Sequence, residues 1–388
     1  MRDVERSQPY VAGVITALVG FASSFTVVLA GLRAVGASER EAASGLLALS
    51  VAMGLVAIVM SWRRKIPVSI AWSTPGAALL GATGAVSGGY PTAVAAFLLC
   101  GILLLITGLW PALSRAVAAI PRSLANGLLA GVLLELCLAP VRAVVDRPAL
   151  AIPVVLVWLA LTRWARRWAV PGALAVALVE IAITARDASF GSFAPVLTWT
   201  APHPAFAALT LGISLYLVTM AAQNLPGVAV LETLDYEAPL APALRNTGLA
   251  TMVIAPLGGI AINLAAISAA LCAGPEGGDD RSRRWIGAAT AGAIYILFGL
   301  GAGALSSFIE VAPAILVEAV AGLALLATLG GALAATVAED GEAPREAGVL
   351  TFLVTASSIE VAGIGAPLWG LLAGLIVTFW LRRRATPT

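Results

Sequence analysis

The chain has 388 residues, of which 60% are hydrophobic and only 11% are charged. Soluble domains are about half apolar and about a quarter charged, so this composition indicates an integral membrane protein and excludes an ordinary soluble one. The formal net charge of +2 sits in short loops and gives no sign of nucleic-acid binding. Cys100, Cys137 and Cys272 all fall in apolar segments, which favours small buried hydrophobic residues over a disulfide or a metal site.

Apolar runs bounded by charges, proline or glycine predict fourteen membrane segments. In chain order they are 10–33, 43–62, 67–85, 91–110, 121–140, 150–163, 170–185, 205–231, 242–256, 257–273, 284–306, 312–338, 346–361 and 364–381. A helix needs about 20 residues to cross the hydrocarbon core, so the shorter segments are expected to be tilted, broken or only partly crossing.

The distribution of Lys and Arg predicts that both termini lie in the cytoplasm. With that orientation most of the 23 basic residues, including the run Arg63, Arg64 and Lys65, lie on the cytoplasmic side. Basic residues concentrate in cytoplasmic loops of membrane proteins, so the asymmetry supports both the orientation and the even number of segments.

Three pairs of stretches match each other in the same order along the chain. They are 13–25 with 212–224, 70–78 with 260–268, and 108–131 with 299–322. Repetition of this kind predicts two halves with the same internal arrangement of segments.

The predicted halves are residues 1–188 and 205–388, joined by a connector at 189–204. Each half holds seven segments, and because seven is odd the second half enters the membrane from the opposite side. We therefore expect an all-α membrane fold with a 7+7 inverted repeat. Inverted repeats are typical of secondary transporters, which bind substrate near the midplane where discontinuous helices meet.

The third segment is interrupted by four consecutive residues, Ser73, Thr74, Pro75 and Gly76. Hydroxyl residues followed by proline are typical of a helix start, so a short extended stretch and then a half-helix are expected. Residues 258–263 are the counterpart in the tenth segment, with a helix expected from Leu264. Exposed N–H groups at two half-helix ends carry partial positive charge and can hold an anion.

Stretches 71–80, 217–231, 262–276 and 352–374 resemble the benzoate/proton symporter family, BenE. The resemblance implies the fold of uracil, nucleobase and sulfate transporters, with short strands in segments 3 and 10. It implies a core domain from segments 1–4 and 8–11, about 10–110 and 205–306. Segments 5–7 and 12–14, about 121–185 and 312–381, would form a gate domain.

Polar and aromatic residues near the broken segments are the candidates for substrate binding. Gln223 and Asn224 lie within segment 8, where polar side chains either join helices or bind substrate. In related nucleobase transporters this region binds substrate, which favours the second role. The remaining candidates are Phe21 and Trp72 for ring stacking or core packing, Ser73 and Thr74 for capping and ligand contact, and Ser24 and Asn263.

Proton coupling normally requires a group that titrates. Glu318, in a predicted gate helix, is the preferred candidate, ahead of Glu135 and Glu180, although the proton could also travel on the substrate carboxylate. Related nucleobase carriers have carboxylates in segments 8 and 10, and this sequence has none there. That difference argues against a nucleobase as substrate.

The resemblance implies proton-coupled symport of benzoate or a related aromatic carboxylate by alternating access, across the bacterial inner membrane. A nucleobase or other anion carrier on the same fold, and an uncoupled anion channel, are the alternatives. An enzyme is not expected, because the sequence has no nucleophile–base or metal-ligand constellation. The expected partners are the aromatic carboxylate, protons and the lipid bilayer, with no cofactor and no nucleic acid, and a homodimer is compatible with the fold.

Overall fold

The structure is a computed structural model. It describes residues 2–22, 24–112, 115, 120–165, 168–184, 194–274, 277–303, 314–338, 344–361 and 364–382. Residues 189–193 of the predicted connector lie outside the described residues, as do residues 23, 185, 304–306 and 312–313 of four predicted segments.

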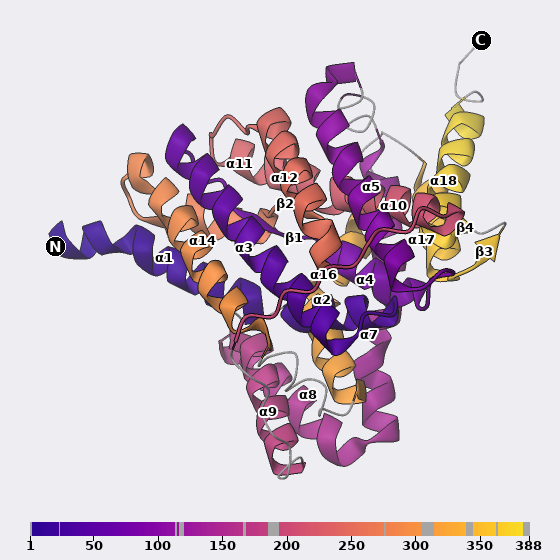
Figure 1. Ribbon diagram of the computed structural model, residues 1–388, viewed down its shortest axis with the longest axis horizontal. Helices are drawn as coiled ribbons and strands as arrows, with labels where there is room; N and C mark the ends of the chain where they lie inside the picture. Colours follow the sequence, from indigo (N-terminus) through magenta and orange to yellow (C-terminus); the bar gives the residue numbers. More distant parts are fainter. Residues whose placement is uncertain are drawn as a thin grey trace.

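The described chain is mostly helical (Figure 1). Its helices in the first half are α1 (Arg2–Ala22), α2 (Phe25–Ala34), α3 (Glu39–Arg64), α4 (Thr74–Thr83), α5 (Tyr90–Leu109), α7 (Arg122–Asp146), α8 (Pro148–Trp164) and α9 (Ala169–Thr184). Those in the second half are α10 (Phe206–Thr219), α11 (Leu225–Thr233), α12 (Leu240–Ile254), α13 (Ala266–Ala273), α14 (Trp285–Leu300), α16 (Ala314–Thr336), α17 (Arg345–Ala356) and α18 (Ala366–Arg382). Each of the fourteen predicted segments overlaps at least one of these helices.

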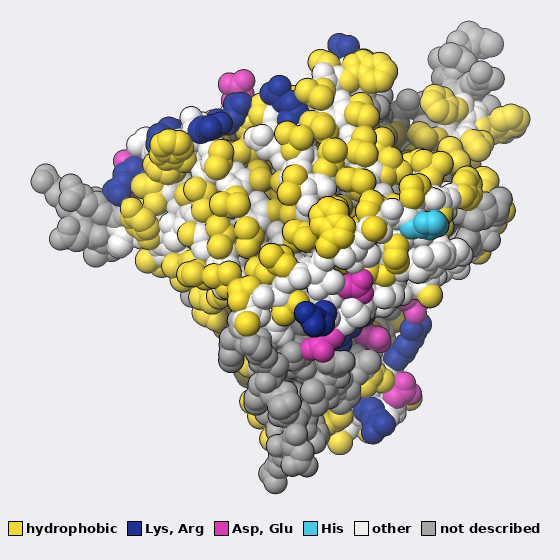
Figure 2. All heavy atoms as spheres, in the orientation of Figure 1, with side chains coloured by type: hydrophobic (Ala, Val, Ile, Leu, Met, Phe, Trp, Pro, Cys, Tyr) yellow, Lys and Arg dark blue, Asp and Glu magenta, His cyan; other side chains and the backbone are white. Residues whose placement is uncertain are grey.

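Five helical stretches of the described chain are long and apolar enough to cross a membrane. They are Glu39–Arg64, Tyr90–Leu109, Arg122–Asp146, Phe206–Glu232 and Glu318–Thr336. The molecular surface agrees, since hydrophobic side chains cover much of the face in Figure 2 and Lys and Arg gather along its upper edge. Trp62, Trp164 and Leu297 are among the large hydrophobic side chains that the fold leaves exposed, as expected where the surrounding medium is lipid. That all fourteen segments cross the membrane stays a prediction.

A pair of short strands lies at the centre of the molecule. Strands β1 (Ile70–Trp72) and β2 (Ile262–Leu264) are antiparallel, with Ala71 opposite Asn263. Two hydrogen bonds extend the pair: Ser73 N–H donates to Ala261 O (2.8 Å) and Ala265 N–H donates to Ser69 O (3.0 Å). The predicted strands in segments 3 and 10 are thereby confirmed. Their mutual pairing satisfies backbone groups that could find no water inside a membrane.

Long helices pack closely around this strand pair. Helix α3 runs along α14, and α5 runs along α12. Glycines allow the close approach: a Cβ on Gly54 would collide with Gly292 O, and one on Gly248 would lie 2.6 Å from Leu105 N. Small residues at such contacts let helix backbones approach each other, as in other membrane helix bundles.

The described part of the connector, residues 194–204, is irregular and crosses the outside of the helices (Figure 1). Thr198 N–H donates to Ser44 Oγ (2.9 Å), and Thr200 N–H donates to Pro256 O (2.8 Å). These bonds fix the connector to α3 and to the short 3₁₀ turn η3 (Ala255–Leu257). A second strand pair, β3 (Glu360–Val361) with β4 (Ile364–Gly365), joins α17 to α18 and was not predicted.

Candidate functional site

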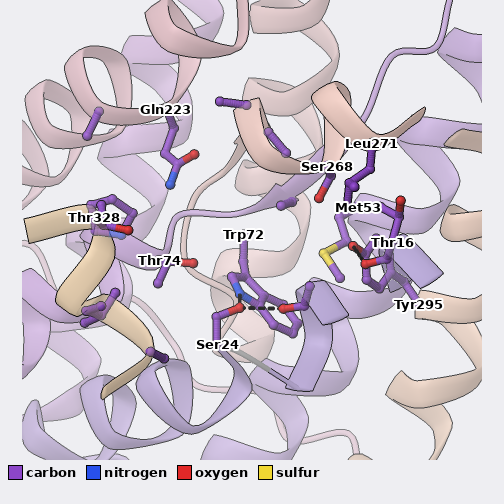
Figure 3. A pocket seen from close by; sticks show the side chains of 18 residues that line it. Thr16, Ser24, Met53, Trp72, Thr74, Gln223, Ser268, Leu271, Tyr295 and Thr328 are labelled. Atoms are coloured by element: carbon purple, nitrogen blue, oxygen red, sulfur yellow. Dashed lines mark hydrogen bonds between the residues drawn. The ribbon is translucent and has the colours of Figure 1, made fainter. Parts of the chain in front are cut away.

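A cavity of about 240 Å³ lies beside the central strand pair (Figure 3). Its walls come from α1, α3, β1, α4, α13, α14 and α16, and from the π-helical turn η2 (Met220–Asn224). A cavity of about 150 Å³ is large enough to take up benzene, so this one has room for an aromatic ring with a small polar group.

The two half-helices begin at the cavity. Ser73 Oγ accepts a hydrogen bond from Gly76 N–H (3.1 Å) and so caps α4, whose first residues, Thr74 and Pro75, line the cavity. Helix α13 begins at Ala266, which also lines it. The positive ends of two helix dipoles therefore face the same space.

Within the described part of the chain, no Lys, Arg, His, Asp or Glu lines this cavity. The favourable potential for an anion therefore comes from backbone N–H groups and from neutral polar side chains. A site of this kind can bind a carboxylate without holding a fixed opposite charge against it.

Gln223 lines the cavity, and its side chain extends toward the side where Thr74 lies (Figure 3). Among the described residues its amide has no hydrogen-bond partner in the protein, so it is available to a ligand. Gln223 lies in η2, just before Pro226. Proline lacks the N–H that a regular helix would donate to Ala222 O, which explains why the helix widens at this point.

Asn224, the next residue, is fully buried and points elsewhere. Its Oδ1 accepts a hydrogen bond from Leu264 N–H (3.1 Å), and its Nδ2 donates to Thr219 O (3.4 Å). Asn224 therefore joins segment 8 to strand β2 and does not line the cavity.

Trp72 and Ser24 form one wall of the cavity (Figure 3). The Trp72 indole Nε1–H donates to Ser24 Oγ (2.9 Å), whose own hydroxyl donates to Gly20 O (2.9 Å). Phe21 packs edge-on against Trp72, with ring centroids 5.2 Å apart, but is itself buried away from the cavity. The indole is thus held in one orientation by a hydrogen bond and by aromatic packing.

Ser73 and Asn263 lie behind the cavity wall and not in it. Ser73 Oγ is 2.8 Å from Thr219 Oγ1, which ties α4 to α10. In the amide orientation that satisfies both groups, Asn263 accepts from Ser73 N–H (3.1 Å) and donates to Leu264 O (2.8 Å). Both side chains therefore stabilise the broken region.

The predicted candidates divide into two groups. Ser24, Trp72, Thr74 and Gln223 line the cavity, whereas Phe21, Ser73, Asn224 and Asn263 support it from behind. Glu318 belongs to neither group, because it is exposed on α16 and does not line the cavity.

Several lining residues were not among the candidates predicted from the sequence. Thr16, Ser268 and Tyr295 bring three hydroxyl groups from α1, α13 and α14, and Met53, Leu325 and Thr328 complete other parts of the wall. Two of them could have been predicted, because each is a polar side chain in an apolar segment: Ser268 in the first turn of a half-helix, and Tyr295 in α14. Met53 and Leu325 could not, since each is one apolar residue among many.

A cavity beside two broken helices, inside a bundle of apolar helices, is the arrangement of a membrane transport protein. The model of the family "benzoate membrane transport protein" (BenE) matches residues 5–380. The chain therefore belongs to the BenE family, as its sequence resemblance implied. It is a transmembrane transport protein and not an enzyme.

Two relatives match nearly the whole chain. One is the inner membrane protein YdcO of Escherichia coli, 38% identical over 94% of this chain and 93% of that protein. Another is the benzoate membrane transport protein of Acinetobacter baylyi, 30% identical over 96% of this chain and 94% of that protein.

Solved structures share the fold at low sequence identity. The transmembrane domain of the cyanobacterial bicarbonate transporter BicA has a TM-score of 0.63 at 16% identity, covering 96% of this chain and 97% of that one. The murine anion transporter solute carrier 26 family member A9, in its inward-facing state, has a TM-score of 0.63 at 12% identity, covering 98% of this chain and 69% of that one.

Proposed function

We propose that this protein carries benzoate or a related aromatic carboxylate across the bacterial inner membrane together with protons, by alternating access. The observation that carries the proposal is the composition of the cavity wall. It combines two half-helix N-termini and the unpartnered amide of Gln223 with the flat face of Trp72, and it offers no charged side chain among the described residues. A ring bearing one carboxylate fits such a wall better than a small inorganic anion does.

In the proposed binding mode the carboxylate lies at the start of α4. There it accepts hydrogen bonds from Thr74, whose N–H lies at the start of the helix, and from Gln223. Its ring lies against Trp72, with Met53 and Leu325 closing the apolar sides. Phe21, Ser73, Asn224 and Asn263 are proposed to keep these groups in position.

One of the two relatives supports this choice of substrate. The Acinetobacter baylyi relative is a benzoate membrane transport protein, and its match extends over both half-helices. A nucleobase is the weaker candidate, because no carboxylate among the described residues lines the cavity to pair with a ring N–H.

We also propose fourteen crossings in a 7+7 inverted repeat, with core and gate domains bounded as the sequence predicts. Two reciprocal features support it. The hydrogen bond from Ser73 N–H to Ala261 O is mirrored by the one from Ala265 N–H to Ser69 O. The packing of α3 on α14 is likewise mirrored by that of α12 on α5. The cavity is bounded on one side by α16, which would belong to the gate domain.

Glu318 remains the proposed proton-coupling residue. Support comes from its place on α16, the same helix that gives Leu325 and Thr328 to the cavity wall. Because the side chain is exposed and does not line the cavity, it would act on the movement of α16 and not on the substrate directly.

The test is uptake of labelled benzoate into proteoliposomes, with and without an inward proton gradient. We expect saturable uptake that the gradient stimulates, and counterflow when unlabelled benzoate is loaded inside. Conductive flux with neither saturation nor counterflow would identify a channel. Absence of any uptake by folded protein would refute the substrate assignment.

A further inference from the structure

The cavity has a second polar end that the proposed carboxylate site does not use. Thr16, Ser268 and Tyr295 gather there from three separate helices, across Trp72 from Gln223 and Thr74 (Figure 3). Tyr295 is 3% exposed and Ser268 is 8% exposed, so both hydroxyl groups are almost completely withdrawn from solvent.

The chain makes room for this cluster by placing a glycine opposite it. A Cβ on Gly20 would lie 2.7 Å from Tyr295 Oη and 3.7 Å from Ser268 Oγ. Any side chain at Gly20 would therefore displace the Tyr295 hydroxyl. Because Gly20 has no side chain, Tyr295 from α14 can reach the cavity wall beside α1.

The internal bonds of this cluster are weak. Tyr295 Oη donates to Thr16 O at 3.5 Å, which is the long limit for an O–H···O hydrogen bond. Thr16 Oγ1 is 3.5 Å from Cys272 Sγ, and a thiol is only a weak hydrogen-bonding partner. Tyr295 also interacts with Ser268. A hydroxyl group can donate once and accept twice, so the three groups retain capacity for another partner.

We propose that this end of the cavity binds a hydroxyl group on the substrate ring, so that the preferred substrates are benzoates hydroxylated at position 3 or 4. The inference rests on the proposed function, since it takes the carboxylate to lie near Thr74 and Gln223. A ring hydroxyl on the far side would donate to one hydroxyl group of the cluster and accept from another. With an unsubstituted ring, these buried hydroxyl groups can form hydrogen bonds only with each other or with water.

The position of the hydroxyl separates this inference from a purely structural cluster. In 2-hydroxybenzoate the hydroxyl is next to the carboxylate and lies at the wrong end of the cavity. A cluster that only stabilises the fold would not distinguish the three isomers.

The experiment measures binding of benzoate and its 2-, 3- and 4-hydroxy derivatives to the purified protein by calorimetry. We expect the 3- or 4-hydroxy compound to bind about fivefold more tightly than benzoate, as one added hydrogen bond allows, and the 2-hydroxy compound to gain nothing. In Tyr295→Phe, and separately in Ser268→Ala, the ratio of the two affinities should fall toward one.

Tyr216→Phe is the matched control, because the Tyr216 hydroxyl is also buried, 2.7 Å from Thr107 Oγ1, but does not line the cavity. Its affinity ratio should equal that of the unmodified protein. Equal binding of benzoate and all three isomers, or a ratio that survives both cavity variants, would overturn the inference alone. Binding of none of the compounds would reject the proposed function with it.

Discussion

Gln223 and Asn224 are consecutive residues in one π-helical turn, yet their side chains lie on different sides of the cavity wall. Gln223 faces the cavity, whereas Asn224 Oδ1 accepts a hydrogen bond from Leu264 N–H (3.1 Å) behind it. The wider turn allows one amide to face a ligand while its neighbour holds strand β2 in place.

Replacing Gln223 should therefore affect binding without affecting stability. In Gln223→Ala the proposed carboxylate loses a hydrogen bond to the amide, so the KM for benzoate should rise about tenfold. Gln223→Glu should be worse still, because it places a like charge beside the carboxylate. Uptake kinetics and thermal unfolding of both variants check this, and an unchanged KM in both would remove Gln223 from the site.

Replacing Asn224 should affect stability first. Asn224→Ala leaves the buried Leu264 N–H without its acceptor, which costs about 1–3 kcal/mol. Thermal unfolding in detergent should show a clearly lower midpoint for Asn224→Ala than for Gln223→Ala. If the two variants unfold at the same temperature, the division of roles is wrong.

Removing the hydroxyl of Ser24 should disturb Trp72. In Ser24→Ala the indole N–H loses its acceptor at 2.9 Å and is no longer held against the cavity. We expect weaker benzoate binding and a shift in tryptophan fluorescence. Thr83→Ala is a suitable control, because its hydroxyl donates to Leu79 O within the same helix, α4. Equal effects of the two changes would contradict the role of Ser24.

The glycine contact between α3 and α14 predicts a sharp steric effect. Gly54→Ala places a methyl group against Gly292 O and should destabilise the protein by about 1–3 kcal/mol. Gly330→Ala in α16 is the matched change, since a Cβ there meets nothing within 4 Å, and it should be neutral or stabilising by up to about 1 kcal/mol. Thermal unfolding compares them, and equal midpoints would refute the contact.

Neutralising Glu318 tests the proposed proton coupling. Glu318→Gln should abolish stimulation of benzoate uptake by a proton gradient while leaving counterflow intact, because exchange of substrate needs no net proton movement. Glu135→Gln tests the second candidate in the same way, and it should leave the stimulation unchanged, since Glu135 pairs with Arg142 and does not line the cavity. Gradient stimulation that persists in Glu318→Gln would leave the proton to another group or to the substrate.

The sequence predicted the broken segments because their cause is local. Ser73 and Pro75 interrupt an apolar run, and the structure confirms that Ser73 caps helix α4. The start of the second half-helix was less well predicted: Leu264 belongs to strand β2, and α13 begins at Ala266. The start of α13 depends on the pairing of β2 with β1, a strand distant in the sequence, and no local sequence pattern indicates that pairing.

The assignment of side chains to the cavity was harder to predict. Asn224 and Gln223 are chemically alike and adjacent, so only the geometry of the π-helical turn separates them. Tyr295 reaches the cavity because Gly20, on another helix, leaves space for it. Such relationships depend on how distant helices pack, which is why Ser24 and Trp72 were foreseen and Tyr295 was not.

The hydrogen-bonded strands link the two half-helices mechanically. With Ala71 paired to Asn263, and Ser73 N–H bonded to Ala261 O, neither α4 nor α13 can tilt without moving the other. In the proposed transport cycle the two positive helix ends would therefore travel as one unit with the anion between them. The carboxylate would stay beside the same partial positive charges throughout the transport cycle. No step of the cycle would then expose an uncompensated negative charge to the lipid.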